Sequence, residues 1–170
     1  MTIEQITDSN YEEFKNSSRA VLVVSTSWCN KCKEYEPIID RLSGQMPFIR
    51  FGKTVLNEDR STQLKREYRD INRWTLPTTL FFKGQREVSR IRGFAPYPNV
   101  VSEIQDNLLL ESLVFIPNGN AYVPALVKYI RNKKGPYRLQ LTEDSSLGRK
   151  GATIELEEEK FQWRLESKTA

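Results

Sequence analysis

The apolar run AVLVVST at residues 20–26 constrains the fold of this chain more than any other stretch. It is continuous rather than alternating and rich in valine, so it predicts a strand that is buried on both faces. Such a strand lies in the middle of a sheet that helices cover. The residues that follow, 29–45, repeat apolar side chains at intervals of three and four, which predicts a helix. Pro37 should kink this helix, and Gly44 marks its expected end.

Strands and helices alternate along the first part of the chain. Further strands are expected at 48–57, 78–83 and 87–92, and further helices at 10–17, 60–71 and 97–110. Asp8 or Ser9 would cap the first helix, and a short turn around Gly84 would join the last two strands as a hairpin. Alternation implies parallel strands, and the hairpin adds an antiparallel part. Residues 1–110 are therefore expected to form an α/β domain with a mixed central sheet flanked by helices.

Residues 111–170 show a different pattern, and we expect a small α+β extension. Segment 122–135 fits a short helix, with Val123, Val127 and Ile130 on one face. Alternating apolar residues predict an antiparallel sheet with strands at 137–142, 152–157 and 160–166. The apolar face of this sheet is too large to stay in water, so it should pack on the first domain, on itself or on a partner.

The composition excludes several classes of catalytic and metal site. The chain has no histidine, which excludes histidine acid–base catalysis, Ser-His-Asp triads and zinc sites with a histidine ligand. It has two cysteines, whereas a structural zinc ion needs four ligands, so a zinc site would require a dimer and no metal is predicted. No cofactor is indicated. No apolar run approaches the roughly 18 residues that a membrane span needs.

The net charge of +4 is mildly basic, and part of the excess lies between Arg60 and Arg73. A basic face can attract nucleic acid or an acidic partner. Acidic residues are interleaved with these basic ones, namely Glu58, Asp59, Glu67 and Asp70. No aromatic stacking platform accompanies them, so a solvated face is expected and nucleic acid is disfavoured as a partner. The polar, acidic N-terminus differs from a secretory or transit peptide, which favours the cytoplasm.

The two cysteines, Cys29 and Cys32, lie where the buried strand ends and the next helix begins. Unpaired backbone N–H groups and partial positive charge at a helix N-terminus stabilise a thiolate, so the pKa of Cys29 should fall below the usual value of about 8.5. Lys31 and Lys33 add positive charge nearby. Cys32 lies one helical turn further on, so the two sulfur atoms can form a disulfide. Cys29 can then attack a substrate disulfide, and Cys32 can resolve the mixed disulfide.

Several short motifs together resemble the thioredoxin family. Trp28 precedes the cysteines in WCNKC, and Pro37 matches the proline that kinks the redox helix of that family. TLPTTLFFKG resembles the family's cis-proline segment, with Pro77 as the proline, and RGF resembles the glycine after the last strand, here Gly93. LNED resembles the segment after the central strand. The resemblance covers residues 1–110 and implies a thioredoxin fold and thiol–disulfide oxidoreductase activity.

The resemblance also implies where substrates bind and which residues modulate the reaction. Pro77, in cis, would face the cysteine pair, and the backbone of Leu76 would bind an extended substrate through β-type hydrogen bonds. Trp28 and Gly93 would border the same groove. The residues expected to modulate the reaction are Asn30, Lys31, Lys33, Glu36 and Pro37. The implied partners are disulfide-bearing proteins and a reductase that supplies electrons.

The chain departs from the thioredoxin pattern at a buried charged pair. Thioredoxins have a buried aspartate six positions before the first cysteine and a lysine on the next strand, whereas this chain has Val23 and, by the LNED alignment, Val55. Loss of one partner alone would leave an unpaired buried charge at a cost of about 3–5 kcal/mol, whereas joint loss is tolerable. We therefore expect Cys32 to lose its proton more slowly, or to use water or Glu36 as the acceptor. The residues between the cysteines also differ from the usual Gly-Pro, which leaves the reduction potential open.

Two functions remain open from the sequence. The first is a thiol–disulfide oxidoreductase that reduces protein disulfides, with residues 111–170 giving partner specificity or self-association. The second is an interaction or redox-sensing module on the same scaffold, without general reductase activity. Two buried thiols that happen to be close are a further interpretation of the cysteine pair. Trp74 and Trp163 are interpreted as packing residues.

Overall fold

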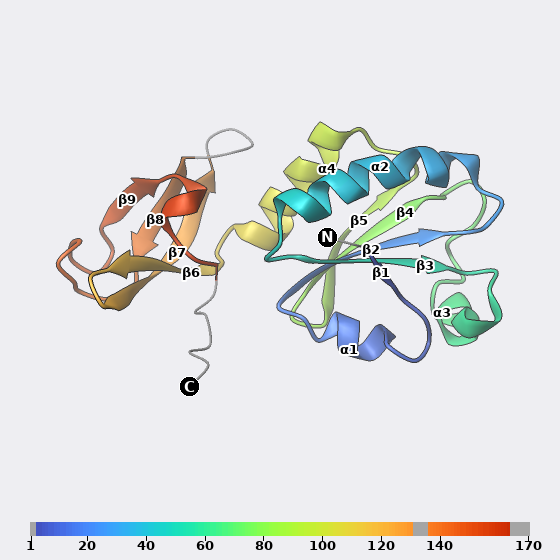
Figure 1. Ribbon diagram of the computed structural model, residues 1–170, viewed down its shortest axis with the longest axis horizontal. Helices are drawn as coiled ribbons and strands as arrows, with labels where there is room; N and C mark the ends of the chain where they lie inside the picture. Colours follow the sequence, from blue (N-terminus) through green and yellow to red (C-terminus); the bar gives the residue numbers. More distant parts are fainter. Residues whose placement is uncertain (1–2, 131–135, 164–170) are drawn as a thin grey trace. The chain divides into compact units, whose positions relative to one another are not determined.

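The computed structural model describes residues 3–130 and 136–163 (Figure 1). The chain divides into two compact units, residues 1–108 and 109–170. The first unit contains a five-stranded sheet in the order β1 (Glu4–Gln5), β3 (Arg50–Val55), β2 (Arg19–Ser25), β4 (Thr78–Lys83) and β5 (Arg86–Arg92). Strands β1, β3 and β2 are parallel, and β4 and β5 continue the sheet antiparallel. The predicted mixed sheet is confirmed.

Helices cover both faces of this sheet. They are α1 (Tyr11–Lys15), α2 (Asn30–Gln45), α3 (Thr62–Glu67) and α4 (Tyr97–Ile104). A 3-10 turn, η1 (Asp59–Ser61), leads into α3, and a π-helical turn, η2 (Gln105–Leu109), continues α4. Figure 1 shows α2 and α4 on one side of the sheet and α1 and α3 on the other. Every residue of β2 is buried, as expected for the central strand of a sheet with helices on both faces.

Two features near the N-terminus differ from the prediction. The two-residue strand β1 pairs with β3 at the sheet edge and was missed, because two polar residues carry no periodic signal. Asp8 does not cap α1, whose N-cap residue is Asn10. The Asp8 carboxylate instead accepts hydrogen bonds from the backbone N–H groups of Gln63 and Leu64, at 2.9 and 3.0 Å, in the first turn of α3. Asp8 therefore ties the N-terminal segment to a distant helix.

Helix α2 is fixed over the sheet by its buried face. Tyr35, Ile39 and Leu42 are buried in this face. The hydroxyl of Tyr35 makes a 2.8 Å hydrogen bond with that of Thr79 on β4, and burial raises the pKa of Tyr35 to about 12. Pro37 lies inside the helix, as predicted. This packing places the first turn of α2 at the end of β2.

The second unit is a four-stranded antiparallel sheet. Its strands, in spatial order, are β6 (Leu113–Asn118), β7 (Ala121–Ile130), β8 (Tyr137–Leu141) and β9 (Thr153–Leu156). A 3-10 turn, η3 (Glu158–Lys160), follows β9. The expected strands at 137–142 and 152–157 correspond to β8 and β9. The sheet is antiparallel throughout, as predicted.

The helix expected at 122–135 is wrong, because β7 occupies residues up to 130 and the rest lies outside the described residues. Val123, Ala125 and Val127 are buried alternately, which is the period of a strand. Residues 123 and 127 also satisfy helical spacing, so the same positions fitted both patterns. Hydrogen-bonded pairing with β6 on one side and β8 on the other shows that this segment forms a strand rather than a helix.

An aromatic cluster closes the second unit after β9. Tyr137, Phe161 and Trp163 pack edge to face, with ring centroids 5.2–5.7 Å apart. The indole N–H of Trp163 donates to Glu158 at 3.2 Å, and burial raises the pKa of that carboxyl group. The strand expected at 160–166 is reduced to a single bridge between Phe115 and Gln162, and Leu165 lies outside the described residues.

Close packing at Gly52 on β3 gives a test of the fold of the first unit. A Cβ atom there would lie 2.6 Å from Cγ1 of Ile6 and 2.9 Å from the ring of Phe14, both buried. We expect Gly52→Ala to lower the free energy of unfolding by about 1–3 kcal/mol, measured by urea denaturation, because the core must shift.

Gly44 in α2 provides the matched control, since nothing lies within 4 Å of an added Cβ. Gly44→Ala should raise the free energy of unfolding by up to about 1 kcal/mol through helix propensity. Equal stability of the two alanine variants would contradict the described packing of β3 against Ile6 and Phe14.

Candidate active site

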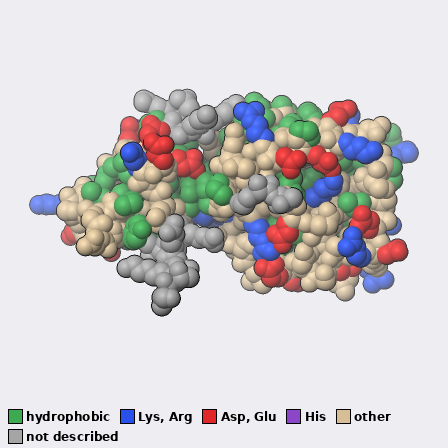
Figure 2. Space-filling model, in the orientation of Figure 1, with side chains coloured by type: hydrophobic (Ala, Val, Ile, Leu, Met, Phe, Trp, Pro, Cys, Tyr) green, Lys and Arg blue, Asp and Glu red, His purple; other side chains and the backbone are tan. Residues whose placement is uncertain are grey.

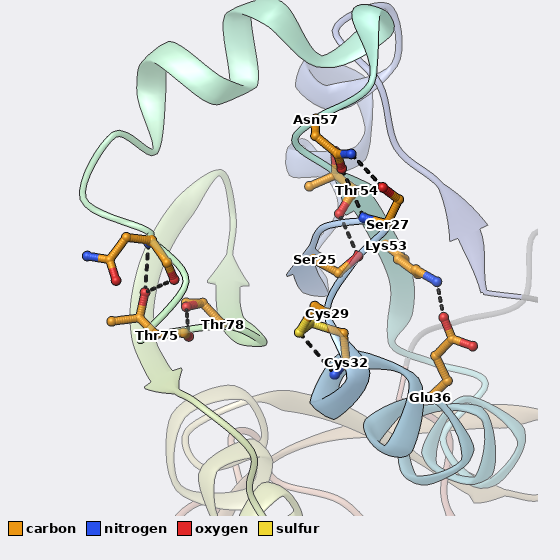
Figure 3. Close-up of a disulfide and its surroundings, with 11 residues drawn as sticks. Ser25, Ser27, Cys29, Cys32, Glu36, Lys53, Thr54, Asn57, Thr75 and Thr78 are labelled. Carbon is orange, nitrogen blue, oxygen red and sulfur yellow. Dashed lines mark hydrogen bonds and ion pairs between the residues drawn. A yellow bond between two sulfur atoms is a disulfide. The ribbon is translucent and has the colours of Figure 1, made fainter.

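Cys29 lies between the end of β2 and the start of α2, where it is the N-cap residue of the helix. Its sulfur accepts a 3.2 Å hydrogen bond from the backbone N–H of Cys32. The two cysteines form a disulfide, with their Cα atoms 5.3 Å apart (Figure 3). Cys29 is 7% exposed and Cys32 4%. The helix N-terminus therefore directs a backbone donor at the sulfur of Cys29, as the sequence predicted.

The peptide bond between Leu76 and Pro77 is cis. The backbone N–H of Gly93, at the end of β5, donates to the carbonyl oxygens of Thr75 and Pro77, at 3.0 and 2.8 Å. Gly93 has a φ of +85°, which suits glycine and strains other residues. The expected proline and glycine therefore belong to one hydrogen-bonded unit at the start of β4.

This proline loop reaches the cysteine pair through the sheet. Val24 of β2 pairs with Thr78 of β4, so the end of β2 and the start of β4 meet at one edge. Leu76, Cys29 and Cys32 belong to the same buried apolar cluster. Figure 3 shows the loop with Thr75 and Thr78 on one side of the cysteines and Glu36 on the other.

Several residues predicted for this site face solvent. Trp28 is 58% exposed, and Asn30, Lys31 and Lys33 are exposed on the first turn of α2. Trp74 is 80% exposed, so its interpretation as a packing residue is wrong. The guanidinium of Arg73 lies over its ring, 4.5 Å from the centroid. The buried position of Trp163 agrees with the packing interpretation.

A charged pair lies behind Cys32, and only one of its two members was predicted from the sequence. Lys53 of β3 forms an ion pair with Glu36 of α2 (Figure 3). Lys53 stands opposite Val23 in the β2–β3 register, two residues before Val55 and therefore on the same face of the strand. Sequence reasoning named Glu36 but missed Lys53, although the strand period of two connects it with Val55.

A small cavity connects this pair with the second cysteine. It has a volume of about 10 Å³, and Val23, Cys32, Glu36 and Lys53 are among its lining residues. This volume is close to the space that one water molecule requires. Val23 and Val55 are buried and apolar, as the sequence indicates. The polar side chains that line this cavity with Cys32 are Ser25 of β2, Glu36 of α2 and Lys53 of β3, and two of them are charged.

The part of the chain that the structure describes contains no group of three or more His, Cys, Asp or Glu side chains placed to hold a metal ion. Among the same residues, no helix has the length and apolar character needed to span a membrane.

Comparison with known proteins identifies the family. A family model described as thioredoxin matches residues 2–109. The chain belongs to the thioredoxin family. The thioredoxin of Staphylococcus saprophyticus is 29% identical over 109 residues, which cover 64% of this chain and 100% of that protein. The chloroplastic M-type thioredoxin of Spinacia oleracea is 29% identical over 111 residues, covering 62% of this chain and 58% of that protein.

Solved structures show the same fold. Chlamydomonas reinhardtii thioredoxin f2 has a TM-score of 0.55 at 20% identity, covering 62% of this chain and 95% of that chain. Mitochondrial thioredoxin 3 of Saccharomyces cerevisiae, in its oxidised form, has a TM-score of 0.53 at 23% identity, covering 61% and 94%. With the Cys29–Cys32 pair at its helix N-terminus, this thioredoxin-family chain is a thiol–disulfide oxidoreductase. The family match ends where the second unit begins.

Proposed function

We propose that this protein reduces disulfides in other proteins, with Cys29 as the attacking and Cys32 as the resolving residue. The Cys29 thiolate attacks one sulfur of the substrate, the substrate disulfide breaks, and a mixed disulfide forms while one substrate thiolate leaves. The Cys32 thiolate then attacks Cys29, which releases the second substrate thiolate and forms the Cys29–Cys32 disulfide. Two electrons pass to the substrate, and a reductase partner would return them to the cysteine pair.

The hydrogen bond from the Cys32 N–H to the Cys29 sulfur carries this assignment of roles. A donor at the helix N-terminus stabilises negative charge on Cys29 as the attacking and leaving sulfur. Cys32 is the less exposed of the two, which suits attack from within the protein. A dithiol that acts as a reductant needs a reducing compartment, so we place the protein in the cytoplasm.

The loop around the cis-proline is proposed as the docking site for the substrate. The backbone N–H and C=O of Leu76 have no hydrogen-bond partner in residues 3–130 and 136–163. An extended substrate segment can use them as a neighbouring strand would. Exposed Trp28 and the tethered Gly93 would border this segment.

Single cysteine variants test the roles of the two sulfur atoms. Cys29→Ser should abolish reduction of insulin disulfides in the presence of dithiothreitol, because the attacking thiolate is missing. Cys32→Ser should accumulate the mixed disulfide, seen by intact mass spectrometry, because the resolving thiol is missing. Absence of reductase activity in the intact protein would favour an interaction or redox-sensing module instead.

We further propose that Glu36 accepts the proton of Cys32, through a water molecule in the small cavity that both residues line. The ion pair with Lys53 holds the carboxylate at this position. The buried aspartate of other thioredoxins is Val23 here, so that acceptor is missing. A carboxylate one water away is within reach for general base catalysis.

Glu36→Gln should slow resolution of a preformed mixed disulfide by about 10- to 100-fold and leave its rate of formation by Cys29 unchanged. Single-turnover stopped-flow measurements separate these two steps. Glu34→Gln is the matched control, because Glu34 is exposed on the same helix and its loss changes the net charge equally. Equal resolution rates in both variants would eliminate Glu36 as the acceptor.

The second unit is proposed to give partner specificity. In Staphylococcus saprophyticus, the whole thioredoxin corresponds to only 64% of this chain, so that relative lacks a counterpart of the second unit. We expect a chain ending at residue 108 to reduce insulin as fast as the full chain and to lose selectivity among protein substrates. A truncated chain that melts cooperatively but reduces insulin much more slowly would give the second unit a catalytic role instead.

A further inference from the structure

A pocket of about 530 Å³ opens beside the redox site. Trp28, which precedes Cys29, and Leu76, which precedes the cis-proline, both line it. The opposite wall comes from α3 and the segment that follows. It contributes four cationic side chains, Lys65, Arg66, Arg69 and Arg73, and none of the Asp and Glu residues that the structure describes lines the pocket. We call this the cationic pocket.

The four cations carry net positive charge that other residues do not neutralise. Within residues 3–130 and 136–163, none of them forms an ion pair with a carboxylate. Three of the four acidic residues that are interleaved in sequence have partners outside the pocket. Glu58 pairs with Arg60, Glu67 accepts a hydrogen bond from Tyr11, and Asp70 pairs with Arg90 and Arg92.

The four cationic residues are exposed, as expected for a solvated face, but their interleaved acidic neighbours do not line the pocket. Helix α3 ends at Glu67, so Arg69 and Arg73 line the pocket from the segment that follows the helix. Over the face of the first unit in Figure 2, basic and acidic side chains lie close together. The cationic pocket differs from that surface because its lining residues carry charge of one sign.

The rest of the lining is mixed, and its polar side chains other than Thr26 are Asn57, Thr62, Tyr68 and Asn72, which have hydrogen-bond partners. Trp28, Leu56, Ile71 and Leu76 provide apolar surface. The buried hydroxyl oxygen of Thr26, another lining residue, has no hydrogen-bond partner among the described residues. Such a lining is complementary to a polypeptide segment with glutamate side chains, whose CH₂ groups can contact the apolar surface while their carboxylates face the cations.

We propose that the cationic pocket binds an acidic segment of the substrate polypeptide, within a few residues of the cysteine that Cys29 attacks. The proposal rests on the proposed disulfide reductase function. Leu76 belongs both to the pocket and to the proposed docking loop, so a substrate segment that docks there continues into the pocket. Cations beside a binding site raise the encounter rate of acidic partners, and salt weakens this effect.

Binding is measured first without redox chemistry. Fluorescein-labelled peptides of one sequence, with serine in place of cysteine, carry Glu, Gln or Lys at the flanking positions. By fluorescence anisotropy at low salt, the Glu peptide should bind about tenfold more tightly than the Gln peptide, and the Lys peptide most weakly. Addition of 0.5 M NaCl should reduce the preference to about twofold or less.

Two triple variants of the full chain with the same loss of charge locate the effect. The first variant should lose the preference for the Glu peptide, and it carries Arg66→Gln, Arg69→Gln and Arg73→Gln. The second variant is the control and should keep the preference. It changes exposed cations outside the pocket, as Arg86→Gln, Arg149→Gln and Lys150→Gln. Far-ultraviolet circular dichroism and thermal melts verify that both variants fold.

The outcomes separate this proposal from the proposed function. Equal affinity for Glu and Gln peptides, equal losses in the two triple variants, or tighter binding of a single-stranded oligonucleotide than of the Glu peptide would overturn it. Disulfide-linked forms of the same peptides report the reaction. If all of them are reduced at the same rate, the proposal for the cationic pocket is wrong and the proposed reductase function still stands. If the peptides bind with a charge preference but none is reduced, the proposed reductase function is wrong and the binding proposed for the pocket still stands.

Discussion

The hydrogen bond from the backbone N–H of Cys32 to the sulfur of Cys29 is the interaction on which the rest of the site depends. It exists because Cys29 caps α2, and α2 begins there because β2 ends there. Strand β2 is buried from Arg19 to Ser25 and its pairing with β3 ends at Ser25, so the chain leaves the sheet there and turns into α2. The end of the central strand thus determines where the backbone donor of α2 meets the sulfur of Cys29.

Most of the first unit could be predicted because its signals are local. A continuous apolar run predicted β2, and apolar residues at helical spacing predicted α2. A short turn with glycine at position 84 predicted the β4–β5 hairpin. The exceptions involve interactions over long distances in sequence. Asp8 caps a helix 55 residues away, and no local pattern distinguishes this from a cap of the adjacent helix. In the second unit, residues 123 and 127 fit both periods, and only pairing with two neighbouring strands selects β7.

The site was predicted less completely than the fold for the same reason. The cysteines, the proline and the glycine are recognisable as motifs, and the structure brings them to one edge of the sheet. The Lys53–Glu36 pair is not a motif, because it joins β3 to α2 across 17 residues of sequence. Alignment by position placed the missing lysine at Val55. The strand geometry shows that a lysine two residues earlier reaches the same side, where Cys32 and Val23 line the small cavity.

The positions of the charged side chains around the cysteine pair therefore matter more than the net charge of the chain. A net charge of +4 says little about recognition, because ion pairs neutralise some surface charges and leave others unpaired. Behind Cys32, Lys53 and Glu36 neutralise each other and can serve proton transfer without a net field. Beside Trp28, the cations of α3 and its following segment form no ion pair within residues 3–130 and 136–163, so under our proposal they would attract acidic segments that approach Cys29 from solvent. The same cysteine chemistry can then operate on a restricted set of substrates, because attraction acts before the sulfur atoms meet.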